Sequence, residues 1–159
     1  MKFPRFPLIT LLTMITMVFV SSCTMHKTTS FKETFEQDTW YRYRKLSFTL
    51  QTQPGNHYYD LRFRIKYTDE FDAEKLPINL TLITPDGEDR TRDYQLRLRD
   101  VHKQPLGEKG NGCHIFEYQL KRDLKISSEG LLRIEIENLM PKIETKGIRE
   151  ADLIVTAHF

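Results

Sequence analysis

Hydrophobic and polar residues alternate along most of the chain beyond residue 40. In residues 61–67, for example, Leu61, Phe63 and Ile65 are separated by single basic residues. Successive side chains of a strand point to opposite faces, so this alternation predicts strands with one buried face. Residues 40–50 add one long strand or two short ones, and the remaining alternating runs cover residues 78–82, 94–99, 116–120, 132–137 and, more weakly, 151–157.

Turn-forming residues separate these runs. Pro54-Gly55-Asn56 and Pro85-Asp86-Gly87 join a fixed backbone angle to residues that tolerate positive φ, which favours tight reversals. No long amphipathic helix pattern interrupts the strands. Seven to eight strands with such turns predict an all-β fold, an antiparallel β-sandwich of jelly-roll or immunoglobulin-like type. A closed barrel produces the same periodicity and stays an alternative.

The first 22 residues have the pattern of a secretory signal peptide. Lys2 and Arg5 precede an uncharged, apolar run over residues 8–20. A transmembrane helix needs about 20 apolar residues, and this run is shorter. We therefore expect export of the chain and removal of the leader.

The end of this leader, Val20-Ser21-Ser22-Cys23, resembles a bacterial lipobox. The resemblance implies cleavage before Cys23, a diacylglyceryl thioether on its sulfur and a fatty acyl group, such as palmitate, on its amino group. Acyl chains contribute about 0.8 kcal/mol per buried methylene, so two or three of them form a lasting anchor. We expect a lipoprotein signal peptide over residues 1–22, a lipidated and flexible tether over residues 23–37 and a β-sandwich domain over residues 38–159.

The charge balance argues against nucleic acid as a partner. The chain has 24 basic and 22 acidic residues, and removal of Lys2 and Arg5 with the leader brings the two numbers to equality. Proteins that bind nucleic acid by neutralising phosphates carry an excess of basic residues.

No residues have the spacing of a catalytic or metal-binding motif. Cys113 and His114 are the one adjacent pair of soft ligands, and neighbours on a strand point to opposite faces. We therefore predict a non-enzymatic protein without a metal or cofactor, in which Cys113 is a small packing residue or a semi-exposed one.

Basic residues line the polar faces of two predicted strands. If the two strands are neighbours, these residues form a basic stripe that suits anionic headgroups, lipopolysaccharide phosphates or an acidic protein. Cross-strand pairing with Glu117, Glu135 and Glu137 is the alternative that we favour. The candidate interaction surface comprises Arg62, Arg64, Lys66, Arg97 and Arg99.

The order of landmarks from Trp40 onward resembles the gliding-motility lipoprotein H (GldH) family of Bacteroidetes. The resemblance covers roughly residues 35–157. It rests on Trp40, Tyr59-Asp60-Leu61-Arg62-Phe63-Arg64-Ile65, Asn79-Leu80, Leu106-Gly107 with Gly110 and Gly112, and Gly147-Ile148.

The resemblance implies an envelope lipoprotein that docks on a protein complex of the gliding and secretion apparatus, with no known cofactor. Together with the lipobox, it implies attachment to the membrane through acyl chains on Cys23. Lipoproteins exported to the cell surface in this phylum resemble one another in a short acidic tag just after the lipidated cysteine. Residues 24–28 contain no acid, so we expect the periplasmic face of the outer membrane. Trp40 and the tyrosines near it leave a second hypothesis, a carbohydrate- or glycan-binding lipoprotein for nutrient uptake.

Overall fold

The computed structural model of the chain describes residues 26–158. Within that range it contains strands and a single turn of 3-10 helix, η1 (Glu36–Asp38). The strands are β1 (His26–Thr34), β2 (Thr39–Tyr41), β3 (Leu46–Thr52), β4 (His57–Tyr67), β5 (Lys75–Ile83), β6 (Asp89–Arg97), β7 (Glu108–Gly110), β8 (Cys113–Ile126), β9 (Gly130–Asn138), β10 (Glu144–Lys146) and β11 (Ile148–His158).

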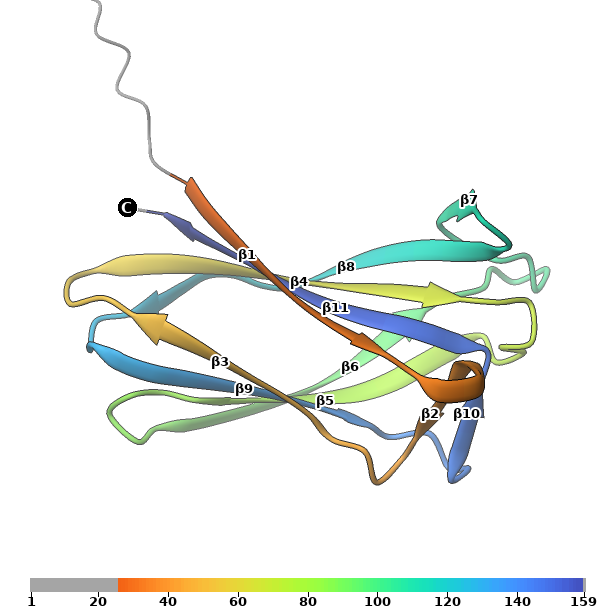
Figure 1. The fold of residues 1–159 in the computed structure, drawn as a ribbon, viewed down its shortest axis with the longest axis horizontal. Coiled ribbons are helices and arrows are strands. Elements are labelled where there is room, and N and C mark those ends of the chain that lie inside the picture. Colours follow the sequence, from red (N-terminus) through yellow and green to blue (C-terminus); the bar gives the residue numbers. More distant parts are fainter. Residues whose placement is uncertain (1–25, 159) are drawn as a thin grey trace, which may run out of the picture.

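Two antiparallel sheets face each other (Figure 1). One has the strand order β1-β11-β4-β8-β7 and the other the order β3-β9-β5-β6, while β2 and β10 form a separate pair. The sheets do not close into a barrel, so the predicted antiparallel β-sandwich is confirmed and the barrel alternative is wrong.

The core lies between the two sheets and contains the residues that the alternation placed inward. Leu61, Phe63 and Ile65 of β4 are fully buried, and they belong to the same core as Leu132 and Ile134 of β9 in the other sheet. Because β4 and β9 lie in the interior of their sheets, each strand has partners on both sides as well as a buried face. The prediction of which side chains point into the core is therefore confirmed for these interior strands.

The segment expected to be a flexible tether is a strand in its described part. β1 pairs with β11 along its whole length, from His26 opposite His158 to Thr34 opposite Glu150. Thr and Ser dominate it, and a single large apolar residue, Phe31, packs on Phe48 with the ring centres 5.7 Å apart. Backbone pairing therefore orders this edge strand although it lacks the apolar alternation of an interior strand. Residues 23–25 of the expected tether, like the leader, lie outside the described residues.

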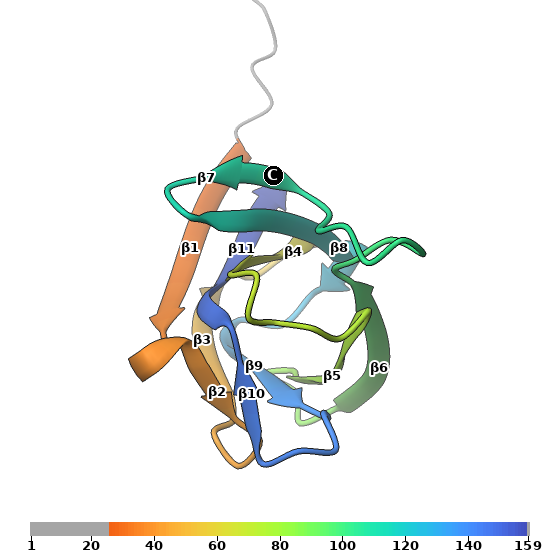
Figure 2. The ribbon, with the colours of Figure 1, turned by 90° about the vertical axis from the view of Figure 1, so that its right-hand side faces the viewer.

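The sandwich has two distinct ends (Figure 1). The start of β1, the end of β11 and the start of β4 lie together at what we call the His26 end, and the β2–β10 pair lies at the opposite, β2–β10 end (Figures 1 and 2). The eleven residues of β4 run between them. At about 3.3 Å per residue, that strand is roughly 33 Å long. Among residues 26–158, no helix is long and apolar enough to cross a membrane.

Candidate functional site

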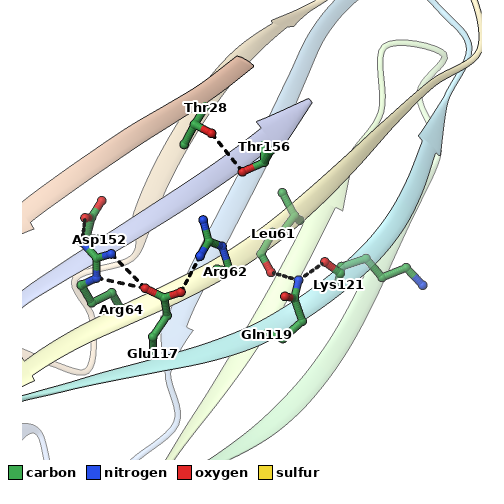
Figure 3. A network of polar contacts seen from close by, with 9 residues as sticks. All are labelled: Thr28, Leu61, Arg62, Arg64, Glu117, Gln119, Lys121, Asp152 and Thr156. Atoms are coloured by element: carbon green, nitrogen blue, oxygen red, sulfur yellow. Dashed lines mark hydrogen bonds and ion pairs between the residues drawn. The ribbon is translucent and has the colours of Figure 1, made fainter. Parts of the chain in front are cut away.

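The basic residues of β4 project from the outer face of the five-stranded sheet and are paired there. The Arg62 guanidinium donates to Glu117 of β8 over 2.7 Å, and Arg64 binds the other oxygen of the same carboxylate over 2.9 Å (Figure 3). Arg64 and Glu117 are direct cross-strand neighbours, which explains the geometry. Glu117 therefore neutralises part of the predicted stripe, as the favoured alternative required.

A second acid lies on the other side of Arg64. Asp152 of β11 is buried and lies 3.5 Å from the Arg64 guanidinium. The Ser30 hydroxyl of β1 donates to Asp152 over 2.5 Å. The contacts of Arg64 therefore extend across β1, β11, β4 and β8, the four long strands of this sheet.

Lys66 is also paired. Its ammonium group lies 2.8 Å from Glu150 of β11, and Lys32 of β1 approaches the same carboxylate at 3.2 Å. Burial alone would raise the pKa of Glu150, but the hydrogen bonds from Lys66 and Lys32 outweigh it and bring the pKa below its usual range. The three basic residues of β4 thus belong to a ladder of ion pairs rather than a free cationic surface.

The structure does not bring Arg97 and Arg99 into this ladder. Arg97 ends β6 in the opposite sheet and binds Glu74 over 2.7 Å. Glu135 and Glu137 also lie in that sheet, where both pair with Lys45. The five residues of the candidate interaction surface therefore do not form one stripe.

Arg99 is a buried structural residue, contrary to its predicted place on the surface. It is only 8% exposed, and its guanidinium donates to three carbonyl oxygens, those of Asp69, Phe71 and Lys103. The backbone N–H groups of Leu98 and Arg99 both donate to the carbonyl of Glu74. This irregularity after β6 interrupts the alternation, so both side chains are buried and Arg99 joins two loops.

A groove of about 830 Å³ begins beside the charged ladder. The loop before β7 forms its rim, and Gly107 lies so close to β8 that a Cβ atom there would overlap the carbonyl oxygen of Ile115. The groove is lined by Arg64, Lys66, Leu106, Gly107, Glu108, Ile115, Phe116 and Glu117. Two of the predicted basic residues therefore border it, although both are already paired.

His114 and Cys113 have separate structural surroundings at the start of β8. The His114 ring is hydrogen-bonded to the Asp69 carboxylate over 2.8 Å, and this bond lowers the pKa of Asp69 against the opposing effect of burial. The Cys113 thiol is buried and donates to the carbonyl of Gly110 over 3.1 Å. Among residues 26–158, no three or more His, Cys, Asp or Glu side chains are arranged to hold a metal ion.

The β2–β10 end carries a second groove, of about 800 Å³. Ile143 on its wall is 66% exposed, and Tyr43 in the turn after β2 is 77% exposed. A hydrogen bond from the Arg42 N–H to the Ile143 carbonyl, 2.8 Å long, holds the two segments side by side. The groove is lined by Glu70, Phe71, Asp72, Met140, Pro141, Lys142, Ile143, Glu144, Thr145 and Lys146.

The exposed pair of Tyr43 and Ile143 was missed in the sequence because Ile143 lies outside the alternating runs and only a long-range contact brings it beside Tyr43. The available signal was an isolated isoleucine in the polar segment after Pro141. Large apolar side chains that gather at a groove are a feature of docking surfaces.

Trp40 does not contribute to this surface. Its side chain is fully buried, stacks on Phe35 with the ring centres 5.2 Å apart and donates through its indole N–H to the Arg44 carbonyl over 2.9 Å. Tyr41 and Tyr43 stack on each other at 5.4 Å. An exposed row headed by Trp40, on which the glycan hypothesis depended, is therefore not formed.

Comparison with known proteins identifies the family but gives few other relatives. A search of curated proteins returns no match. Among solved structures, the chain is similar to one described as "Structure of infectious bursal disease virus Gx strain", with 9% identity and a TM-score of 0.34. That match covers 86% of the present chain and 32% of the viral chain, so this chain spans about a third of its length.

The fold and its surface define a small antiparallel β-sandwich with a ladder of ion pairs on one outer face and exposed apolar residues at one end. The chain belongs to the GldH lipoprotein family, whose model matches residues 27–154. The resemblance found in the sequence is thus confirmed. The protein is a lipoprotein of gliding-motility type and is associated with a membrane through its lipid. Cys23, the predicted lipidation site, lies outside the described residues.

Proposed function

We propose that this chain is a non-enzymatic lipoprotein that docks on an envelope protein complex of the gliding and secretion apparatus. Acyl chains on Cys23 attach it to the periplasmic face of the outer membrane. The family match and the lipobox support the anchor. The exposed Tyr43 and Ile143 beside a groove support docking through the β2–β10 end.

The separation of the two ends carries this proposal. β1 begins three positions after Cys23 and starts at the His26 end, whereas Tyr43 and Ile143 lie at the β2–β10 end. β4 runs between the ends and is roughly 33 Å long at the usual rise of a strand. An anchor at one end leaves the apolar residues of the other end free to meet a partner. Because the anchor concentrates the domain at the membrane, weak contacts at that end suffice.

The anchor is tested by mass spectrometry of the full chain isolated from envelopes. We expect a mature chain that begins at Cys23 and carries a diacylglyceryl group with an additional acyl chain. Cys23→Ala should abolish acylation and processing at this position. An unmodified Cys23 thiol in the wild-type chain would refute this part of the proposal. Protease treatment of intact cells tests the leaflet, since efficient loss of the domain would contradict a periplasmic placement.

Docking is tested by capture of the lipidated full chain from detergent-solubilised envelopes. We expect one envelope complex to be recovered with the wild-type chain and to be lost with the double variant Tyr43→Ser, Ile143→Ser. Leu131→Ser is the matched control, since Leu131 is 60% exposed but lies at the start of β9, at the His26 end. Equal recovery by all three chains would contradict docking through the β2–β10 end.

A further inference from the structure

Cations without an acidic partner are found near the His26 end, away from the charged ladder. Lys121, Arg122 and Lys125 lie in the second half of β8, and all three are exposed. Arg62, Arg64 and Lys66 each have a carboxylate partner, whereas these three form no ion pair with any residue of the described range. These three cations therefore leave unpaired positive charge on this sheet toward the end of β8.

Lys125 belongs to a row that crosses the whole sheet. His26 of β1 pairs with His158 of β11, His158 pairs with Tyr58 of β4, and Tyr58 pairs with Lys125 of β8. Residues in direct register share one face of the sheet, and the strands are about 4.8 Å apart. Tyr58 is 41% exposed, and His26 and Lys125 are exposed as well. We call these four residues the His26 row.

The row begins where the chain leaves the predicted anchor. Three residue steps separate Cys23 from His26, and an extended chain advances at most about 3.6 Å per residue. The start of β1 therefore lies within about 11 Å of the Cys23 backbone. β1 is paired with β11 from its first residue, so no unpaired residue of β1 lengthens the link between the sheet and the predicted anchor.

Two acidic groups near the row have contacts of their own, whereas Asp123 of β8 and Glu129 just after it are exposed. Asp60 accepts a hydrogen bond from the Asp123 N–H over 2.9 Å and lies 3.3 Å from the His158 ring. In the turn between β5 and β6, at the same end, Glu88 pairs with Arg90 over 2.6 Å. Neither Asp60 nor Glu88 therefore forms an ion pair with the exposed cations of β8.

We propose that the His26 row, together with Lys121 and Arg122, is a contact surface for the anionic headgroups of the membrane that holds the lipid anchor. Tyrosine prefers the headgroup level, where its ring is apolar and its hydroxyl is hydrated, and basic residues are attracted by anionic lipids. The contact sets the tilt of the sandwich and directs the β2–β10 end away from the bilayer. This inference rests on the proposed anchor at Cys23.

The test uses the full, lipidated chain and places a fluorescent reporter at each of the two ends of the sandwich. Tyr58→Trp and Tyr43→Trp introduce an exposed indole at the His26 end and at the β2–β10 end, and the buried Trp40 gives the same background in both. The chains are reconstituted into vesicles of phosphatidylcholine alone or mixed with phosphatidylglycerol, with or without brominated acyl chains. Intact mass and flotation report acylation and vesicle attachment independently of fluorescence.

We expect brominated lipids to quench the indole of Tyr58→Trp by about half, as suits a ring at the headgroup level, and to leave that of Tyr43→Trp unchanged. Quenching should be stronger in vesicles that contain phosphatidylglycerol. Adding Lys121→Gln and Lys125→Gln should remove this dependence on lipid charge. Lys103 and Lys142 are two exposed lysines at the β2–β10 end, and adding Lys103→Gln and Lys142→Gln should leave the dependence on lipid charge unchanged.

The alternative outcomes separate this inference from the proposed anchor. An acylated, floating chain with equal quenching at positions 58 and 43 overturns the oriented contact and leaves the anchor standing. The role of the cations is overturned if quenching is the same with and without phosphatidylglycerol. It is also overturned if Lys121→Gln and Lys125→Gln leave the dependence on phosphatidylglycerol unchanged. A chain that is neither acylated nor attached to vesicles overturns the anchor and this inference together.

Discussion

The Asn138 side chain donates a hydrogen bond of 2.7 Å to the Thr145 hydroxyl, and both residues are buried. The same amide group donates to the Trp40 carbonyl over 3.2 Å, and its oxygen accepts from the Met140 N–H over 2.9 Å. Asn138 ends β9, whereas Trp40 and Thr145 lie in β2 and β10. One amide therefore fastens the separate β2–β10 pair to the four-stranded sheet, and with it one wall of the docking groove.

Asn138→Ala should destabilise the fold by about 2–3 kcal/mol, because it leaves buried donors and acceptors without partners. The measurement is urea unfolding of the full chain followed by fluorescence of Trp40, the single tryptophan. Asn79→Ala is the control, since Asn79 bonds Asp93 on the outer face of the same sheet. Its cost should stay below about 1 kcal/mol. Similar losses for both variants would argue against the fastening role of Asn138.

Glu117→Gln should change the surface of the protein more than its stability. Glu117, Arg62 and Arg64 are each about one-third exposed, so their ion pairs contribute less than about 1 kcal/mol after solvent screening. The substitution leaves Arg62 without its carboxylate and Arg64 with Asp152 alone, and retention on a cation-exchange column should increase. Glu129→Gln makes the same change in net charge at an exposed residue that has no ion pair within residues 26–158. If both variants elute together, local neutralisation by Glu117 is not what governs this face.

The alternation of hydrophobic and polar residues was sufficient to predict the strands that have one apolar and one charged face. β4 and β9 lie inside their sheets, so Leu61, Phe63 and Ile134 are forced inward and the charged residues between them outward. β1 could not be predicted in the same way, because an edge strand held by backbone pairing with β11 needs no regular apolar face.

The candidate site was harder to predict because it depends on which strands are neighbours. Local periodicity places Arg64 and Arg97 on polar strand faces, but only long-range pairing puts them in different sheets. Arg99 was misplaced for a local reason, the shared Glu74 carbonyl that interrupts the strand just before it. The lipobox, by contrast, is a contiguous motif and needs no tertiary information.

Gly107→Ala should destabilise the protein by about 2 kcal/mol or more through backbone strain and overlap. Gly107 has a φ of +93°, and a Cβ atom there would meet the Ile115 backbone. Gly110→Ala is a matched control in the same loop region, since no atom lies near its added Cβ and its φ is not positive. That variant should change the free energy of unfolding by less than about 0.5 kcal/mol. Thermal unfolding of both variants checks the difference, and an equally stable Gly107→Ala chain would show that the loop is free to move off β8.

Glu150 makes the stability of the five-stranded sheet depend on pH in the acidic range. Its pKa in the folded chain lies below the ordinary value of 4.5, because the hydrogen bonds from Lys66 and Lys32 outweigh the effect of burial. A carboxyl whose pKa is lowered by folding stabilises the native state above its unfolded pKa, and this contribution is lost as the pH falls through the folded pKa. Glu150→Gln removes the titrating group, so the difference in the free energy of unfolding between wild type and variant should shrink as the pH falls from about 5 toward 3. Urea unfolding at a series of pH values measures this difference.

The control is Glu144→Gln, at an exposed glutamate of β10 that forms no ion pair with the residues described, and it should give a difference from wild type that stays constant with pH. A Glu150→Gln difference that is equally constant would mean that Lys66 and Lys32 do not hold the carboxylate in solution.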